Sequence, residues 1–207
     1  MFKGTPEIIA QRREEIVSAC EQLYQTMSFK DITLKEISNV TSFSRPTIYN
    51  YFHTKEEIFL ALYEKEYDRW NADLEKILNS DQKYSRAELA DQIARSLEKR
   101  TQLLKLLSMN NYDMEENSRS ELLASFKIAY GKSLELFRKI LRKNCTGMSN
   151  AEIEQIMYVF FPFMFGIYPY SEVTDKQKNA MREAEVSYKY QTIYEITYSC
   201  LIKLLKN

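Results

Sequence analysis

The chain has 207 residues, which predicts one domain or two small ones. Hydrophobic residues make up 44% of it, enough to build a packed core, so the composition excludes an intrinsically disordered tail. Lys and Arg together number 29, as do Asp and Glu, and this zero net charge excludes a polybasic protein held on nucleic acid by bulk charge.

Glycine and proline are rare, with four residues of each. Strand-rich folds and glycine-rich nucleotide loops use more turn residues, so the composition favours a mostly helical chain. His53 is the only histidine, and the three cysteines, Cys20, Cys145 and Cys200, lie in no C-x-x-C pair. We therefore expect no disulfide framework, metal site or cofactor. No nucleophile–base pair or phosphate loop points to an enzyme.

The longest apolar run, residues 156–168, has 13 residues and contains Pro162. A membrane-spanning helix needs about 20 residues, and the N-terminal residues lack the apolar stretch of a signal peptide. These features predict a soluble cytoplasmic protein that makes no membrane contact.

Six helix starts are marked by a Ser or Thr followed three residues later by Glu or Gln, a pairing that caps a helix. The capping residues are Thr33, Thr54, Ser85, Ser118, Ser149 and Thr174. Together with helical spacing of the apolar residues, they predict an all-α protein of about nine helices. The expected helices cover residues 6–27, 34–40, 45–52, 55–78, 86–97, 100–110, 118–143, 150–168 and 188–205. No linker-like stretch divides the chain, and we place a domain boundary at the start of the fourth helix, between residues 1–53 and 54–207.

Two short helices joined by a three- or four-residue turn, within residues 33–52, have the dimensions of a DNA-binding helix-turn-helix. In the second of them Ile48 and Phe52 lie four residues apart and are expected to face inward. That burial leaves exposed the side chains of Arg45, Pro46, Thr47, Tyr49 and Asn50. Their guanidinium, carboxamide, hydroxyl and methyl groups are the kinds that read base edges in a major groove.

At this point the sequence resembles the TetR family of bacterial transcriptional regulators. The resemblance rests on Phe29-Lys-Asp-Ile-Thr33-Leu-Lys-Glu-Ile37, on Phe43-Ser44-Arg45-Pro-Thr47-Ile48-Tyr49-Asn50-Tyr51-Phe52 and on Lys55-Glu-Glu-Ile58-Phe59. It covers about residues 8–60; beyond them only the architecture matches, a long connecting helix followed by a helical ligand-binding and dimerisation domain.

The resemblance implies a role for individual residues of this motif. The base-reading set would be Arg45, Pro46, Thr47 and Asn50. The phosphate-contacting set would be Thr33, Ser44, Tyr49, Tyr51 and Lys55, with Thr33 and Ser44 also capping the two short helices.

The motif departs from the family pattern at Ser28, Ser42 and Tyr51, the last at a position where the family often has histidine, and it carries little positive charge. Ser28 and Ser42 stand where the family commonly has glycine, and a positive φ at Ser42 would cost roughly 1 kcal/mol relative to glycine. Between residues 30 and 55 there are four basic and two acidic residues. A surplus of only two positive charges predicts modest nonspecific affinity, with specificity depending on dimer geometry and neutral donors at phosphates.

Aromatic residues and methionines are concentrated in two parts of the C-terminal half, where the family resemblance implies a ligand pocket. Such pockets are mostly apolar, and methionine adapts to varied ligands, although for any single residue an ordinary core is the more common explanation. The expected ligand is small and apolar or aromatic. The candidate pocket residues are Met109, Tyr112, Tyr158, Phe161, Phe165 and Tyr168.

The last helix carries an apolar stripe at heptad-like spacing, and with helix 150–168 it can form a two-fold four-helix bundle, as in dimers of the family. The candidate interface residues are Phe160, Met164, Ile193, Thr197, Cys200, Leu201 and Leu204. The connector 169–187 is expected either to cover the mouth of the pocket or to be a surface segment.

These features predict a homodimeric, ligand-responsive transcriptional regulator, in this family most often a repressor, that binds a pseudo-palindromic operator in double-stranded DNA. The alternative is a helical small-molecule-binding or scaffold protein that has lost DNA binding. The small positive surplus favours the alternative, and the intact helix-turn-helix residues argue against it.

Overall fold

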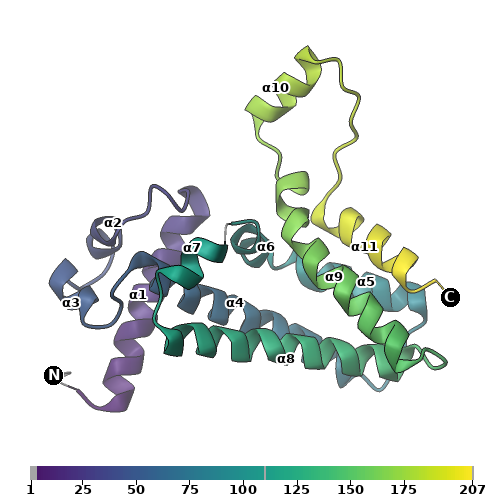
Figure 1. Ribbon diagram of the computed structural model, residues 1–207, viewed down its shortest axis with the longest axis horizontal. Coiled ribbons are helices and arrows are strands. Elements are labelled where there is room, and N and C mark those ends of the chain that lie inside the picture. The colour runs from purple at the N-terminus through teal and green to yellow at the C-terminus, as the bar shows by residue number, and fades with distance from the viewer. Residues whose placement is uncertain (1–3, 110, 207) are drawn as a thin grey trace. The chain divides into compact units, whose positions relative to one another are not determined.

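The computed structural model describes residues 4–109 and 111–206, and the predicted all-α fold class is confirmed (Figure 1). Within these residues there are eleven helices. They are α1 Pro6–Thr26, α2 Leu34–Asn39, α3 Arg45–Tyr49, α4 Lys55–Leu78, α5 Arg86–Glu98, α6 Thr101–Leu107, α7 Asn111–Glu116, α8 Ser120–Asn144, α9 Asn150–Ser171, α10 Asp175–Glu183 and α11 Ile193–Leu204. The nine helices expected from the sequence did not include the short helices α7 and α10.

Several helix ends follow directly from local capping. Ser85 and Ser149 each form a complete capping box, and the Thr174 side chain accepts from the amide of Gln177. The expected cap at Ser118 is wrong, because α8 begins at Ser120 and the buried Ser118 hydroxyl has no hydrogen-bond partner among the described residues. A capping box at Thr192 starts α11 later than the expected residue 188.

The helices form two compact units. The first contains the described residues up to Glu66 together with 111–130, and the second contains residues 67–109 and 131–206. Helices α4 and α8 each run from one unit into the other.

The core of the first unit joins the helix-turn-helix to α1 and α4. Ile16 and Cys20 of α1, Ile37 of α2 and Ile48 of α3 are fully buried. The ring of Phe59 in α4 lies edge-on to Tyr24, with the ring centres 5.2 Å apart. Apolar burial on all four helices therefore holds the short helices α2 and α3, which are too short to be stable alone.

The core of the second unit is built around aromatic rings. Phe137 of α8 stacks on Phe160 of α9, with ring centres 5.0 Å apart, and meets Phe161 edge-on. The indole N–H of Trp70 donates to Ser96 Oγ at 3.0 Å. Helix α11 packs against α5 and α9. Phe160 was expected at a dimer interface, but no part of its side chain is exposed.

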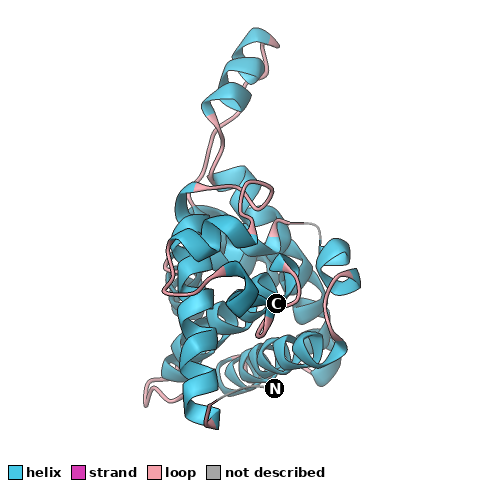
Figure 2. Cartoon of the chain, turned by 90° about the vertical axis from the view of Figure 1, so that its left-hand side faces the viewer, coloured by secondary structure: helices cyan, strands magenta, loops and turns pink. Residues whose placement is uncertain are grey.

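The segment between α9 and α11 stands away from the other helices of its unit (Figures 1 and 2). No residue of α10 is buried, and most residues from 172 to 190 are exposed. Of the two interpretations of this connector, the structure agrees with the surface segment.

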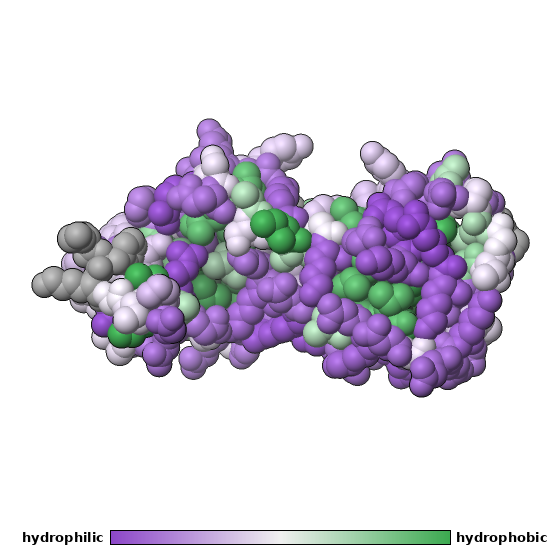
Figure 3. All heavy atoms as spheres, turned by 90° about the horizontal axis from the view of Figure 1, so that it is seen from below, coloured by the Kyte–Doolittle hydropathy of each residue, from purple (hydrophilic) through white to green (hydrophobic). Residues whose placement is uncertain are grey.

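Most of the surface is polar on the face shown in Figure 3, where apolar residues appear in separate small patches. Within the described part of the chain, no helix combines the length and the apolar character needed to cross a membrane.

Replacing Phe160 with alanine is expected to destabilise the second unit by about 3–5 kcal/mol, because the truncation leaves a cavity among three packed rings. Urea unfolding followed by circular dichroism measures this change. The control is Tyr170→Ala, since Tyr170 of the same helix is 59% exposed, and it should cost less than about 1 kcal/mol. Equal effects of the two substitutions would contradict the placement of Phe160 in the core.

Candidate nucleic-acid interface

The first helix of the motif, α2, is held by a cap at its N-terminal end and by its buried apolar side. Thr33 Oγ1 accepts from the amides of Lys35 and Glu36 at 3.2 and 3.4 Å, and the Thr33 hydroxyl also contacts the Glu36 carboxylate. Leu34 and Ile37 are buried. Helix α2 packs against both α1 and α3, so the cap and the apolar side together orient it.

The turn between α2 and α3 is held by Glu15 of α1. One carboxylate oxygen of Glu15 accepts from the amide of Ser42 at 2.8 Å and from its hydroxyl at 2.7 Å. These two bonds lower the pKa of Glu15. Outside glycine, Glu185 is the one described residue with a positive φ, so the conformational cost considered for Ser42 does not arise.

The second helix of the motif, α3, presents the expected base-reading residues on one side. Ile48 is fully buried, which fixes the helix about its own axis. Arg45, Pro46 and Asn50 are exposed. Thr47 is half-buried, and its hydroxyl lies 2.9 Å from that of Ser44.

The expected phosphate-contacting residues divide into two groups. Thr33, Ser44 and Tyr49 are exposed. Tyr51 is only 5% exposed, and its hydroxyl accepts from Arg12 at 3.1 Å. The ammonium group of Lys55 donates to the carbonyl of Phe29 at 2.9 Å.

The phosphate-contacting roles expected for Tyr51 and Lys55 stay predictions, although both side chains have partners inside the first unit. Lys55 also lies 4.1 Å from the centre of the Phe29 ring. Both side chains contact partners inside the first unit. The residues that carry the family resemblance do not predict these partners. The Tyr51 contact is with α1, and the Lys55 contact is with the residues before α2.

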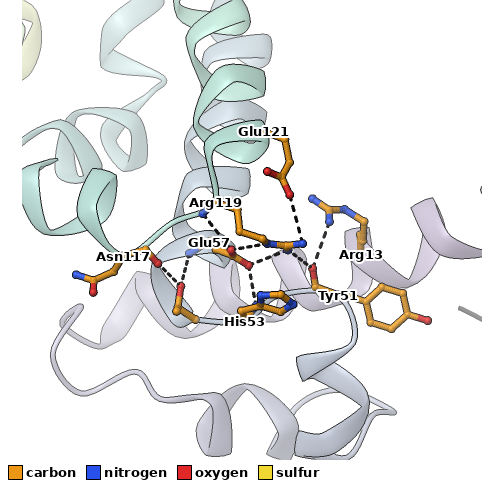
Figure 4. Close-up of polar contacts among 8 residues, drawn as sticks. Arg13, Tyr51, His53, Glu57, Asn117, Arg119 and Glu121 are labelled. Carbon is orange, nitrogen blue, oxygen red and sulfur yellow. Dashed lines mark hydrogen bonds and ion pairs between the residues drawn. The ribbon is translucent and has the colours of Figure 1, made fainter. Parts of the chain in front are cut away.

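An ion pair between a buried carboxylate and a partly exposed guanidinium lies behind the motif (Figure 4). Glu57 of α4 is 1% exposed, and both of its carboxylate oxygens accept from the guanidinium of Arg119, at 2.7 and 2.9 Å. Burial by itself raises the pKa of Glu57, but the bonds from Arg119 and from the amide of His53 outweigh it and hold the pKa below its usual range. The members of this pair lie 62 positions apart, so no local pattern in the sequence points to it.

The expected ligand-pocket residues differ in their exposure and in the unit to which they belong. Tyr112 belongs to the first unit and is 83% exposed. Tyr158 and Phe165 lie on the exposed side of α9, whereas Phe161 is buried in the core. Since these three residues follow one another at i, i+3 and i+7, they lie toward one side of α9 with different exposure, and a pocket that they share stays a prediction. Met109 and Tyr168 are half-buried in the second unit.

The expected dimer residues are also placed differently. Most of them are buried within the second unit: Phe160, Met164, Ile193, Thr197 and Leu201. Since α11 packs against α5 and α9, its strongest apolar stripe is used inside the chain, which corrects the expected interface. Cys200 and Leu204 are half-buried.

A shallow groove lies between α9 and α11 of the second unit. It has a volume of about 200 Å³ and is lined by Met148, Glu152, Gln155, Ile156, Val159 and Leu204. Sites for drug-sized ligands usually enclose about 300–1,000 Å³, so the groove is small for such a ligand. Among the described residues no group of His, Cys, Asp and Glu is arranged to hold a metal ion.

Taken together, the exposed α3 on its braced turn and the helical second unit define the fold of a helix-turn-helix transcriptional regulator. Residues 16–62 match the family model described as bacterial regulatory proteins, tetR family. Residues 64–191 match the model of the tetracyclin repressor-like C-terminal domain. The chain belongs to the TetR family, and the resemblance seen in the sequence is confirmed.

Solved structures of the family have the same fold. A TetR-family regulator from Mesorhizobium loti is 16% identical, with 98% of each chain covered and a TM-score of 0.63. The fatty acid degradation regulator FadR from Bacillus halodurans is 14% identical, with 99% of this chain and 97% of that chain covered and a TM-score of 0.62. At these identities the likeness shows the fold alone. No curated protein matches the sequence.

The bond between Glu15 and Ser42 predicts a pH dependence. Because the folded pKa of Glu15 is lowered, the stabilisation is complete above its unfolded pKa and is lost as the pH falls through the folded value. We expect Glu15→Gln to lower the unfolding free energy at pH 7 by about 1 kcal/mol or less. The difference from the wild type should shrink as the pH approaches 3.

Urea unfolding midpoints measured between pH 7 and pH 3 test this expectation. Glu98→Gln, at an exposed position that ends α5 in the second unit, serves as the control. A difference between wild type and Glu15→Gln that stays constant over this range would contradict the role of the Glu15 carboxylate.

Proposed function

We propose that the chain is a homodimeric, ligand-responsive transcriptional regulator, acting as a repressor, that reads a pseudo-palindromic operator with α3. The observation that carries this proposal is the exposed side of α3, which presents Arg45, Pro46 and Asn50 while Ile48 anchors the helix from behind. A helix inside a bundle would not leave all three exposed. Since DNA of a bacterial cell lies in the cytoplasm, we place the protein there.

The exposed groups suit direct reading of bases. The Arg45 guanidinium can bond both acceptors of guanine, and the Asn50 carboxamide can bond adenine. Thr47 offers a hydroxyl and a methyl group. Thr33, Ser44 and Tyr49 are exposed beside them and provide hydroxyl groups for phosphates.

For the homodimer we propose the exposed side of α9. Tyr158, Pro162, Phe165 and Pro169 are exposed at helical spacing, and Tyr158 is 82% exposed. Exposed apolar side chains in a continuous row are typical of a protein–protein interface. The half-buried Cys200 and Leu204 of α11 are candidates to extend it. Two DNA half-sites about one helical turn apart, or a multiple of it, would match the two α3 helices.

For the ligand response we propose that a small apolar or aromatic molecule binds in the second unit. Its core of aromatic side chains around Trp70, Phe137 and Phe161 supports this choice of ligand class. The ligand regulates only if it binds with different affinity to the DNA-bound and DNA-free arrangements.

The alternative is a helical ligand-binding or scaffold protein that has lost DNA binding. The zero net charge of the chain favours it. Selection of bound sequences from a random duplex pool, at about physiological salt, separates the two. A pseudo-palindromic consensus supports the regulator, and failure to enrich any sequence even at low salt supports the alternative.

Asn50→Ala is expected to change the preferred base at one or two positions of each half-site, because a carboxamide bonded to a base edge is worth about 1–3 kcal/mol in discrimination. Competition binding with singly substituted operators measures the preference at each position.

The matched control is Asn39→Ala, since Asn39 is an exposed asparagine at the end of α2. It should leave the preference unchanged. If Asn50→Ala weakens binding to all sequences alike, its assignment as a base-reading residue is wrong.

Tyr158→Glu is expected to raise the dimer dissociation constant at least about tenfold, because a carboxylate would be buried in the interface without a partner. Analytical ultracentrifugation over a concentration series measures it. Tyr112→Glu is the matched control, because Tyr112 is equally exposed, at 83%, but lies in the first unit. If both variants dimerise like the wild type, the exposed side of α9 is not the dimer interface.

A further inference from the structure

The chain just past the carboxyl end of α3 is held by two arginines that are distant in the sequence. The carbonyl of Tyr51 accepts from Arg119 Nη2 at 3.1 Å and from Arg13 Nη1 at 3.4 Å (Figure 4). The Arg13 guanidinium also lies 4.5 Å from the centre of the Phe52 ring. Cations are favourable where backbone carbonyls at a helix end lack partners, so the two groups fix the place at which α3 ends.

Arg119 is itself held rigidly. Its guanidinium meets both oxygens of Glu57, a charge-assisted bidentate contact that fixes the plane of the group as well as its position. The Glu57 carboxylate also accepts from the amides of His53, at 2.7 Å, and of Arg119, at 3.2 Å. One carboxylate thus fixes the residue before Thr54, the start of α4 and the side chain that holds Tyr51.

A third link joins the same two segments. Thr54 Oγ1 donates to the carbonyl of Asn117 at 2.9 Å and accepts from the amide of Glu57 at 3.2 Å. The segment 117–119 immediately before α8 is therefore bonded to the turn 51–54 through backbone and side-chain groups. All of these residues lie within the first unit.

We propose that Arg119 is a positioning residue for DNA recognition, which holds the carboxyl end of α3 through the Tyr51 carbonyl and is held in turn by Glu57. The proposal rests on the proposed function and adds to it a residue outside the helix-turn-helix. Asn50, a proposed base reader, directly precedes the residue whose carbonyl Arg119 holds. Arg119 acts on DNA binding through the direction of α3, without touching a phosphate.

This role makes α8 a second connection between the two units. Helix α4 continues from the turn that Glu57 holds, and α8 starts one residue after Arg119. Both helices then run into the second unit. A displacement of the start of α8 would reach the turn after α3 through the Arg119 guanidinium and through the bond between Thr54 and Asn117.

The test uses the full chain and a duplex obtained by selection from the random pool. Arg119→Gln removes the charge and the bidentate contact, and Arg119→Lys keeps the charge but cannot bond both oxygens of Glu57 and the Tyr51 carbonyl together. The matched control is Arg138→Gln, because Arg138 of the second unit bonds both oxygens of Glu154 at 2.6 and 3.1 Å. Affinities for the selected duplex and for a random duplex are measured at several salt concentrations, beside the unfolding midpoint.

We expect Arg119→Gln and Arg119→Lys both to weaken binding to the selected duplex about tenfold or more, roughly the worth of one well-placed base contact. Affinity for the random duplex and the salt dependence should stay close to those of the wild type, because no phosphate contact is lost. Arg138→Gln should leave all binding values unchanged. Glu57→Gln should reproduce the effect of Arg119→Lys.

Two results would overturn the proposal. One is a folded Arg119 variant whose affinity for the selected duplex stays within twofold of the wild type. The other is an equal loss for both duplexes with a smaller salt dependence and rescue by lysine, which identifies Arg119 as a phosphate contact. If Arg119→Gln does not fold, Arg119→Lys decides between these outcomes. If the wild type selects no duplex, the proposed function fails before this inference is reached.

Discussion

The buried carboxylate of Glu57 is the constraint on which the arrangement of the first unit depends. A charge that is 1% exposed is stable only with donors around it, and the chain supplies two backbone amides and the guanidinium of Arg119. Because Arg119 lies 62 positions further along, the segment 111–130 has to return to the helices near the N-terminus. The first unit is therefore compact in space although it is discontinuous in sequence.

What could be predicted from the sequence was local. The bounds of the fourth expected helix, 55–78, agree with α4, and the helix-turn-helix was located by the cap at Thr33 and by the spacing of Ile48. The side-chain cap expected from Ser44 is wrong, because its hydroxyl contacts Thr47 and makes no capping bond to a backbone amide. Those features depend on neighbours three or four residues away. Contacts such as Glu15 with Ser42, or Lys55 with the carbonyl of Phe29, join residues 27 and 26 positions apart, and nothing in local spacing points to them.

Helix α9 shows a second limit of what can be predicted from the sequence. It is apolar around almost its whole circumference, so periodicity could not say which side faces the core. The structure buries Phe160 and Met164, which were expected at the interface, and exposes Tyr158 and Phe165, which were expected in the pocket. Its orientation is decided by the rings of α8, since Phe137 stacks on Phe160, and such a partner is not visible in the sequence of α9 alone.

The use of charge in the first unit bears on the DNA recognition that we propose for this chain. Arg12, Arg13, Lys55 and Arg119 all bond groups within the unit, so these cations serve its internal structure. The exposed cations of the motif are Lys30, Lys35 and Arg45. With so few of them the release of counterions contributes little affinity, and discrimination has to come from the exact placement of a few base contacts. A protein of this kind gains more from bracing its recognition helix from behind than from adding positive charge in front.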